Sequence, residues 1–120
     1  MLFKEINILR LFIYNCLTCT RNTGIINMIK SFADKETEKI FNQIFSRKLP
    51  QSIQSVALRK LIMIDKAKSL ADLWVPPANK LEALKGDREG QFSIRINDQY
   101  RICFTPDGVD YFDVEIVDYH

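Results

Sequence analysis

Several residue types are scarce in this sequence, and each scarcity excludes a class of protein. The single His among 120 residues excludes a His-rich zinc site and any mechanism that needs two histidines. Three Cys are too few, and odd in number, for a disulfide scaffold. No uncharged apolar run reaches the ~18 residues of a transmembrane helix. Lys and Arg total 17 against 15 Asp and Glu, so neither a strongly basic nucleic-acid binder nor an acidic tail is indicated.

The composition that is present is that of one globular domain. Hydrophobic residues make up 47% and charged residues 27% of the chain, which argues against intrinsic disorder. The length matches a domain of roughly 100–150 residues.

The first 27 residues differ from the rest of the chain. Lys4, Arg10 and Arg21 outweigh Glu5 there and account for the whole net charge of +2, so residues 28–120 are neutral. The CxxC at residues 16–19 has neither a second ligand pair nor a βαβ context, so we do not favour a redox or zinc role for it. We interpret residues 1–27 as a doubtful N-terminal extension, read in frame upstream of an alternative start at Met28, and residues 28–120 as the functional domain.

Residues 28–68 predict a short strand followed by two helices. Residues 29–32 alternate between apolar and polar side chains, as in a strand. Asp34 can cap a first helix with an apolar stripe of Ile40, Phe41, Ile44 and Phe45, which ends before Pro50. A second helix is expected over residues 52–68, with an apolar stripe and a polar face. Its polar face would carry Arg59, Lys60, Lys66 and Lys68.

From Gln91 the hydrophobic period changes to two. Residues 92–96, 100–104 and 109–119 then predict three strands joined by short turns, which is an antiparallel meander. Helices followed by strands indicate an α+β fold, with both helices on one face of the sheet and the other face partly open.

Basic side chains are concentrated around the predicted open face. Lys80, Lys85 and Arg88 precede the meander, and Arg95 and Arg101 lie on the polar side of its first two strands. Such a face suits single-stranded RNA, whose phosphates need cationic partners. Solvated surface charges, partly paired with neighbouring acids, are the simpler interpretation.

The only histidine is the last residue. His120 follows Asp118 and Tyr119, and imidazole is the side chain whose ordinary charge change lies nearest neutral pH. The C-terminal tripeptide could therefore transfer protons.

Five blocks of residues 28–120 resemble the HigB toxins of the RelE/ParE superfamily, most closely their GraT-like branch. They are residues 28–32 (MIKSF), 79–84 (NKLEAL), 86–91 (GDREGQ), 93–104 (SIRINDQYRICF) and 114–120 (VEIVDYH). The resemblance implies a microbial-RNase-like α+β fold, a cytoplasmic toxin of a type II toxin–antitoxin system, and no metal or cofactor.

The resemblance also implies an activity and partners. These toxins resemble ribosome-dependent endoribonucleases that cleave mRNA in the ribosomal A site and so inhibit translation. The implied partners are a HigA-like helix-turn-helix antitoxin, the ribosome and mRNA, and operator DNA through the antitoxin complex, with no membrane. Asp118, Tyr119 and His120 match the terminal catalytic motif, and Arg101 matches the arginine expected at the scissile phosphate.

One residue departs from the common family pattern. Many HigB members carry a His where this chain has Glu82, which matches the GraT-like branch. Glu82 could act as a base, but it adds negative charge near phosphate, which predicts slow cleavage. Lys80, Lys85, Arg88 and Arg95 are expected to contact RNA.

Two alternatives differ in activity. The domain could bind only antitoxin and operator, with its catalysis lost. It could also be a ParE-like poison of DNA gyrase, although the terminal Asp-Tyr-His disfavours that interpretation.

Overall fold

Two helices precede a four-stranded antiparallel sheet in this protein. The computed structural model describes residues 28–119. Its helices are α3 (Lys35–Phe41) and α4 (Gln51–Lys66), and its strands are β1 (Glu82–Ala83), β2 (Phe92–Arg95), β3 (Tyr100–Asp107) and β4 (Asp110–Asp118). Two short 3-10 turns, η2 (Leu70–Trp74) and η3 (Pro77–Asn79), connect α4 to β1, and a third, η4 (Gly86–Arg88), lies between β1 and β2. The predicted α+β class is confirmed.

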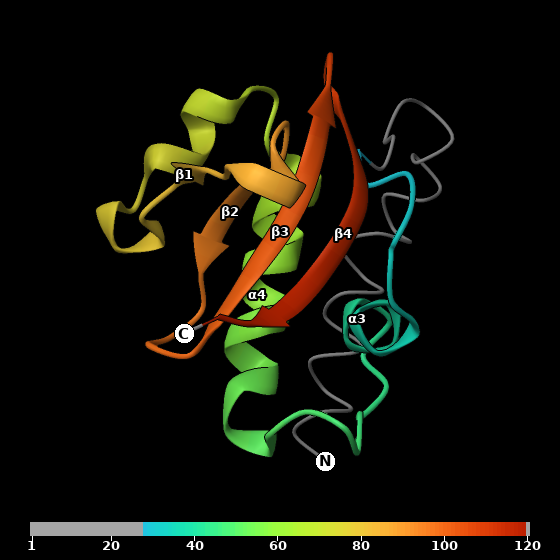
Figure 1. Cartoon of the computed structure of the whole chain (residues 1–120). Helices are drawn as coiled ribbons and strands as arrows, with labels where there is room; N and C mark the ends of the chain where they lie inside the picture. The colour runs from blue at the N-terminus through green and yellow to red at the C-terminus, as the bar shows by residue number, and fades with distance from the viewer. Residues whose placement is uncertain (1–27, 120) are drawn as a thin grey trace.

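The strands lie in the order β1-β2-β3-β4, and each pairs antiparallel with the next. The predicted meander of three strands is β2–β4, and the two-residue β1 adds a fourth strand at its edge. Sequence periodicity missed β1 because two residues cannot display an alternation. Helix α4 lies behind one face of the sheet, and α3 lies beside β4 (Figure 1). We call the face that packs on α4 the inner face and the opposite one the outer face.

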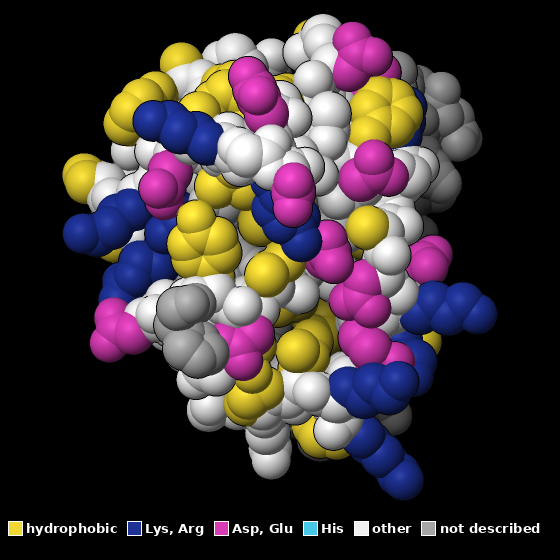
Figure 2. Space-filling view, viewed as in Figure 1, with side chains coloured by type: hydrophobic (Ala, Val, Ile, Leu, Met, Phe, Trp, Pro, Cys, Tyr) yellow, Lys and Arg dark blue, Asp and Glu magenta, His cyan; other side chains and the backbone are white. Residues whose placement is uncertain are grey.

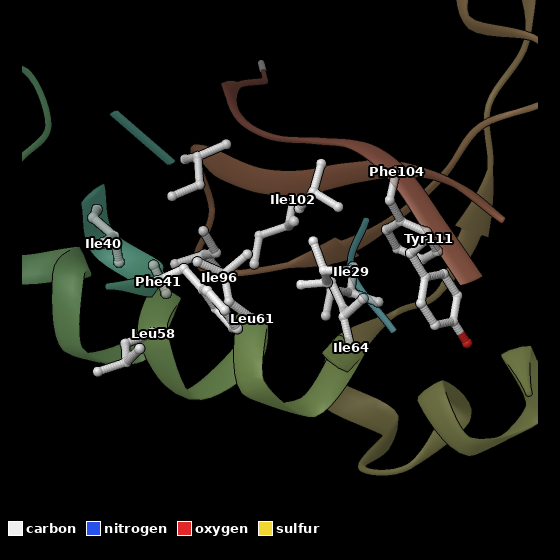
Figure 3. Packing of buried hydrophobic residues seen from close by; sticks show 14 of the residues in the cluster. Ile29, Ile40, Phe41, Leu58, Leu61, Ile64, Ile96, Ile102, Phe104 and Tyr111 are labelled. Atoms are coloured by element: carbon white, nitrogen blue, oxygen red, sulfur yellow. The ribbon is translucent and has the colours of Figure 1, made fainter. Parts of the chain in front are cut away.

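The inner face carries the hydrophobic core. Alternating side chains of β2, β3 and β4 pack against the apolar stripe of α4, as the sequence predicted, and Figure 3 shows them between helix and strands. Among them are Ile94, Ile102, Val114, Leu61 and Ile64, which are all fully buried.

A bulge in β4 adds a residue to this core that simple alternation would exclude. Cys103 pairs with Glu115, whereas Thr105 pairs with Phe112, so the register shifts between them. Asp113 adopts a left-handed backbone with φ 53° at this point. The extra residue turns both Tyr111 and Val114 toward the core, where Tyr111 meets Phe104 edge to face with a centroid separation of 5.4 Å.

The predicted first strand is only two isolated parallel bridges, from Ile29 to Tyr111 and from Phe32 to Val114. The buried carboxylate of Asp65 on α4 fastens its start, since Oδ1 accepts from the amides of Met28 (2.9 Å) and Ile29 (3.0 Å).

Helix α3 is shorter than predicted. Asp34 caps it as expected, accepting from the amides of Glu36 and Thr37. The helix ends after Phe41 because Gln43 turns left-handed (φ 63°) and the Ile44 amide donates back to the Lys39 carbonyl at 2.7 Å. Ile44 and Phe45, expected in the buried stripe, are therefore 53% and 51% exposed.

One residue of α4 also departs from the expectation. The helix spans Gln51–Lys66 rather than residues 52–68, and Lys60, assigned to the polar face, is buried. Within residues 28–119, no helix is long and apolar enough to cross a membrane.

Candidate active site

The outer face of the sheet is more enclosed than its polar side chains suggested. Ser93 on β2 and Cys103 on β3 are fully buried, and Arg101 is 8% exposed. The segment before β2 turns back over this edge: the Leu84 amide donates to the Gln91 carbonyl at 2.9 Å, and Leu84 is buried. The turn between Leu84 and Gln91 favours glycine at two positions, because Gly86 and Gly90 have positive φ angles of 68° and 97° that other residues rarely adopt. The outer face is therefore a covered polar layer at its β1 side.

Arg101 is the centre of this layer. Its Nε donates to Ser93 Oγ at 2.7 Å. Its Nη2 donates to the carbonyl oxygens of Lys80 (2.5 Å) and Ser93 (3.3 Å) and lies 3.4 Å from Glu82 Oε1. The plane of the guanidinium is thereby fixed by three residues, Lys80, Glu82 and Ser93, which no single flexible ion pair would achieve.

Strand register explains the direction that Arg101 takes. Arg95 on β2 lies directly opposite Arg101 on β3, and like charges facing each other across a strand pair repel. Arg95 instead pairs with Asp98 in the following turn, and Arg101 extends diagonally to Ser93. The two arginines that the sequence placed on one face therefore do not converge.

The end of β4 meets the same cluster. Tyr119 is 39% exposed, and the centroid of its ring lies 5.7 Å from the guanidinium carbon of Arg101, within cation–π range. The Tyr119 amide donates to the Gln99 carbonyl (2.5 Å), and Gln99 Nε2 donates to Asp118 Oδ2 (3.0 Å). The turn between β2 and β3 thus holds both residues in place. His120 lies outside the described residues.

The other predicted basic residues are spread around the edge of the cluster. Lys80 and Lys85 have exposed side chains. Arg88 donates to Gln91 Oε1 at 2.8 Å and lies 3.4 Å from Glu115 Oε1 on β4. Of the predicted residues, the structure brings together Glu82, Arg101 and Tyr119, with Lys80 contributing a carbonyl rather than its ammonium group.

Charge is divided across the outer face. Figure 2 views this face and shows Asp and Glu side chains gathered over β4, with most Lys and Arg side chains toward its margins. This matches the sequence, in which residues 102–120 contain several acids and no Lys or Arg. Burial raises the pKa of the Cys103 thiol in this layer, so the thiol is not an activated nucleophile.

Sequence reasoning missed Ser93, Gln99 and the Lys80 carbonyl as supports of the cluster. Alternation placed Ser93 on the same side as Arg101, but the register that joins them depends on turn geometry. No group of three or more His, Cys, Asp and Glu side chains among residues 28–119 could hold a metal ion.

This arrangement suits recognition of a phosphate beside a flat ring. A fixed guanidinium offers positive charge in a partly dehydrated place, and the exposed Tyr119 ring offers a stacking surface next to it. The Glu82 carboxylate, 3.4 Å from Arg101 Nη2, supplies a proton acceptor beside them.

Comparison with known proteins gives consistent matches for this chain. The sequence model described as "RelE-like toxin of type II toxin-antitoxin system HigB" matches residues 30–120. The chain is 40% identical over 84 residues to "Toxin HigB-1" of Vibrio cholerae serotype O1, covering 68% of this chain and 88% of that protein. It is 33% identical over 93 residues to "Endoribonuclease HigB" of Proteus vulgaris, covering 78% of this chain and 100% of that protein.

Proposed function

Because this chain belongs to the HigB-like family of RelE-like toxins of type II toxin–antitoxin systems, we propose that it cleaves mRNA in the A site of the ribosome. It is a toxin of the endoribonuclease kind, and its system class gives it an antitoxin partner. The observation that carries the proposal is the convergence of Glu82 and Tyr119 on the Arg101 guanidinium.

The chemistry uses the RNA's own nucleophile. A base removes the proton of a ribose 2′-OH, the oxygen attacks the adjacent phosphorus, and the bond to the 5′-oxygen breaks as that oxygen takes up a proton. Arg101, held by Ser93 and the Lys80 carbonyl, would stabilise the charge that develops on the phosphate, without having to reorganise during the reaction. Asp118, Tyr119 and His120 would transfer the protons.

Glu82 stands where many HigB members carry a His, and this difference supports the assignment to the GraT-like branch. Its carboxylate lies 3.4 Å from Arg101 Nη2 and is half exposed, so it can receive a proton from substrate. The same charge offsets part of the arginine's attraction for phosphate. The toxin would therefore act slowly.

The charge balance supports ribosome dependence. RNA affinity in solution grows with the number of phosphates that a protein neutralises, and residues 28–120 carry no net charge. Lys80, Lys85, Arg88 and Arg95 surround the cluster and would contact mRNA or ribosomal RNA once the ribosome has positioned the substrate.

The test compares naked mRNA with the same mRNA on translating ribosomes, with cut sites read by primer extension. We expect new 5′ ends only with ribosomes, and none for Arg101→Ala. Efficient digestion of naked RNA at physiological salt would overturn ribosome dependence. No new 5′ ends in either sample would favour a binding role without catalysis, and gyrase-linked DNA breaks would favour gyrase poisoning.

The same proposal defines the partners and the functional unit. The antitoxin would be a HigA-like helix-turn-helix protein that brings the complex to operator DNA, and the toxin would act in the cytoplasm, where mRNA is translated. The toxin domain would span residues 28–120, which the family match over residues 30–120 supports. Co-purification with the product of the neighbouring gene and the N-terminal mass of the native protein test these two points.

A further inference from the structure

A buried lysine in α4 has no part in the mechanism above. Lys60 is 6% exposed, and its ammonium group donates to Oδ1 of Asn79 in η3. Desolvation lowers the pKa of Lys60, and the neighbouring charges of Arg59 and Arg95 lower it further. An apolar side chain would fill this place without those costs. The polar group at position 60 therefore calls for a reason beyond packing.

Asn79 connects Lys60 to the segment that leads into β1. Asn79 is fully buried, and its Nδ2 donates to the carbonyl oxygens of Leu73 (3.1 Å) and Val75 (3.4 Å) and lies 3.2 Å from Met63 Sδ. One amide thus holds η2 and η3 against α4. All the polar atoms of its side chain are used, which is the condition for a buried polar network to impose one conformation.

The next residue carries this constraint to the candidate active site. Lys80 adopts a left-handed backbone with φ 45° and ψ 58°, and its amide donates to the Pro77 carbonyl at 3.0 Å. That conformation directs the Lys80 carbonyl to Nη2 of Arg101, 2.5 Å away. Two residues further on, Glu82 pairs with the same nitrogen.

We propose that Lys60 and Asn79 are positioning residues, which fix the Lys80 carbonyl and thereby orient the Arg101 guanidinium for phosphate. The path runs from Lys60 Nζ to the Asn79 side chain, through one peptide unit to the Lys80 carbonyl, and on to Arg101. Neither residue contacts substrate. The claim that this orientation speeds cleavage rests on the proposed function. The claim that Lys60 and Asn79 orient Arg101 does not.

The test uses Lys60→Met, which keeps most of the apolar stem and removes the donor, together with Asn79→Asp. Asn79→Asp keeps an acceptor for Lys60 but loses the donor to the Leu73 and Val75 carbonyls. Arg59→Met, an exposed neighbour on the same helix, is the matched control. The readouts are kcat and KM for cleavage on ribosomes, the thermal midpoint, and hydrogen exchange of the Arg101 Nε–H, assigned by its loss in Arg101→Lys.

For both variants we expect kcat to fall about tenfold with KM changed less than about twofold, since small displacements of a catalytic group are costly. The Arg101 Nε–H should exchange about tenfold faster, because its hydrogen bond to Ser93 would be less well held. The double variant should cost no more than the larger single one, as expected of residues on one path. Arg59→Met should match the unmodified protein.

Lower thermal midpoints with Arg101 exchange and kcat unchanged would overturn the proposal and leave Lys60 and Asn79 as supports of the fold alone. If the unmodified protein cleaves no mRNA on ribosomes, the proposed function fails. Faster Arg101 exchange in the two variants would still support the positioning path in that case, and unchanged exchange would overturn it.

Discussion

The inner face of the sheet is buried, and the outer face is buried at its β1 side, but by different means. On the inner face, alternating aliphatic and aromatic side chains pack on α4. On the outer face, Arg101, Ser93 and the Lys80 carbonyl form a hydrogen-bonded layer closed by β1 and the turn that follows it. Packing of the first kind tolerates exchange between apolar residues of similar volume. A polar layer of the second kind depends on individual donors and acceptors. The inner face should therefore govern stability, and the outer face activity.

Removing a core side chain tests the stability half of this comparison and should have the largest effect. Leu61 on α4 is fully buried in the core. Leu61→Ala should lower the free energy of unfolding by about 2–5 kcal/mol, through lost burial and the cavity left behind. Denaturant unfolding measures this loss. Cleavage per folded molecule, assayed well below the thermal midpoint, should stay near that of the unmodified protein, and a large fall in kcat there would break the division between the faces.

The conservative exchange at Arg101 tests the other half. Lys cannot reproduce the fork that reaches Ser93, Lys80 and Glu82 together. Arg101→Lys should reduce kcat for cleavage on ribosomes by about 100-fold, the scale of losing one preorganised electrostatic contact in an active site. The stability loss should be smaller than that of Leu61→Ala. Equal activity of Arg101→Lys and the unmodified protein would remove the guanidinium geometry from the mechanism.

The inner face is the part that the sequence predicted well. Alternation in β2–β4 and the helical stripe of α4 are properties of neighbouring residues, so they can be read without knowing the fold. The Asp34 cap is local in the same way. The end of α3 was predicted too late because left-handed Gln43 has no signal comparable to glycine. Tyr111 was missed because the bulge at Asp113 breaks the alternation.

On the outer face the sequence placed Arg95 and Arg101 on one side of the sheet, but it did not predict their contacts. The resemblance supplied Arg101, Asp118, Tyr119 and His120, yet nothing local indicated that Arg101 would be 8% exposed or that Arg95 would turn away to Asp98. Both depend on strand register and on the return of the chain over β1. The burial of Lys60 was missed for the same reason, since its partner Asn79 lies 19 residues away in sequence.

A pH titration distinguishes a covered outer face from an open one. Burial raises the pKa of Cys103 above its usual value near 9. Above pH 9 the unfolded chain loses this proton before the native protein does, so the native state binds more protons and stability falls as pH rises. The contribution of this one thiol is at most about 1.4 kcal/mol per pH unit.

Cys103→Ala is the matched comparison, because all other titrating groups are common to both proteins. The unmodified protein should lose stability faster than Cys103→Ala between pH 9 and the raised pKa, as followed by urea unfolding at several pH values. Parallel pH curves would mean that solvent reaches the thiol and that the outer face is open at β3.

The smallest effect is expected at the ion pair that joins η4 to β4 on the outer face. Arg88 in η4 and Glu115 in β4, with side chains 36% and 30% exposed, lie 3.4 Å apart. Arg88→Met should cost about 0.2–1 kcal/mol of stability, and raising the salt concentration should shrink the difference, because exposed pairs are weak and screened. Denaturant unfolding at low and high salt measures both. Cleavage should fall less than in Arg101→Lys, since Arg88 would contact RNA without orienting the scissile phosphate. A loss equal to that of Arg101→Lys would instead extend the catalytic cluster to Arg88 and Glu115.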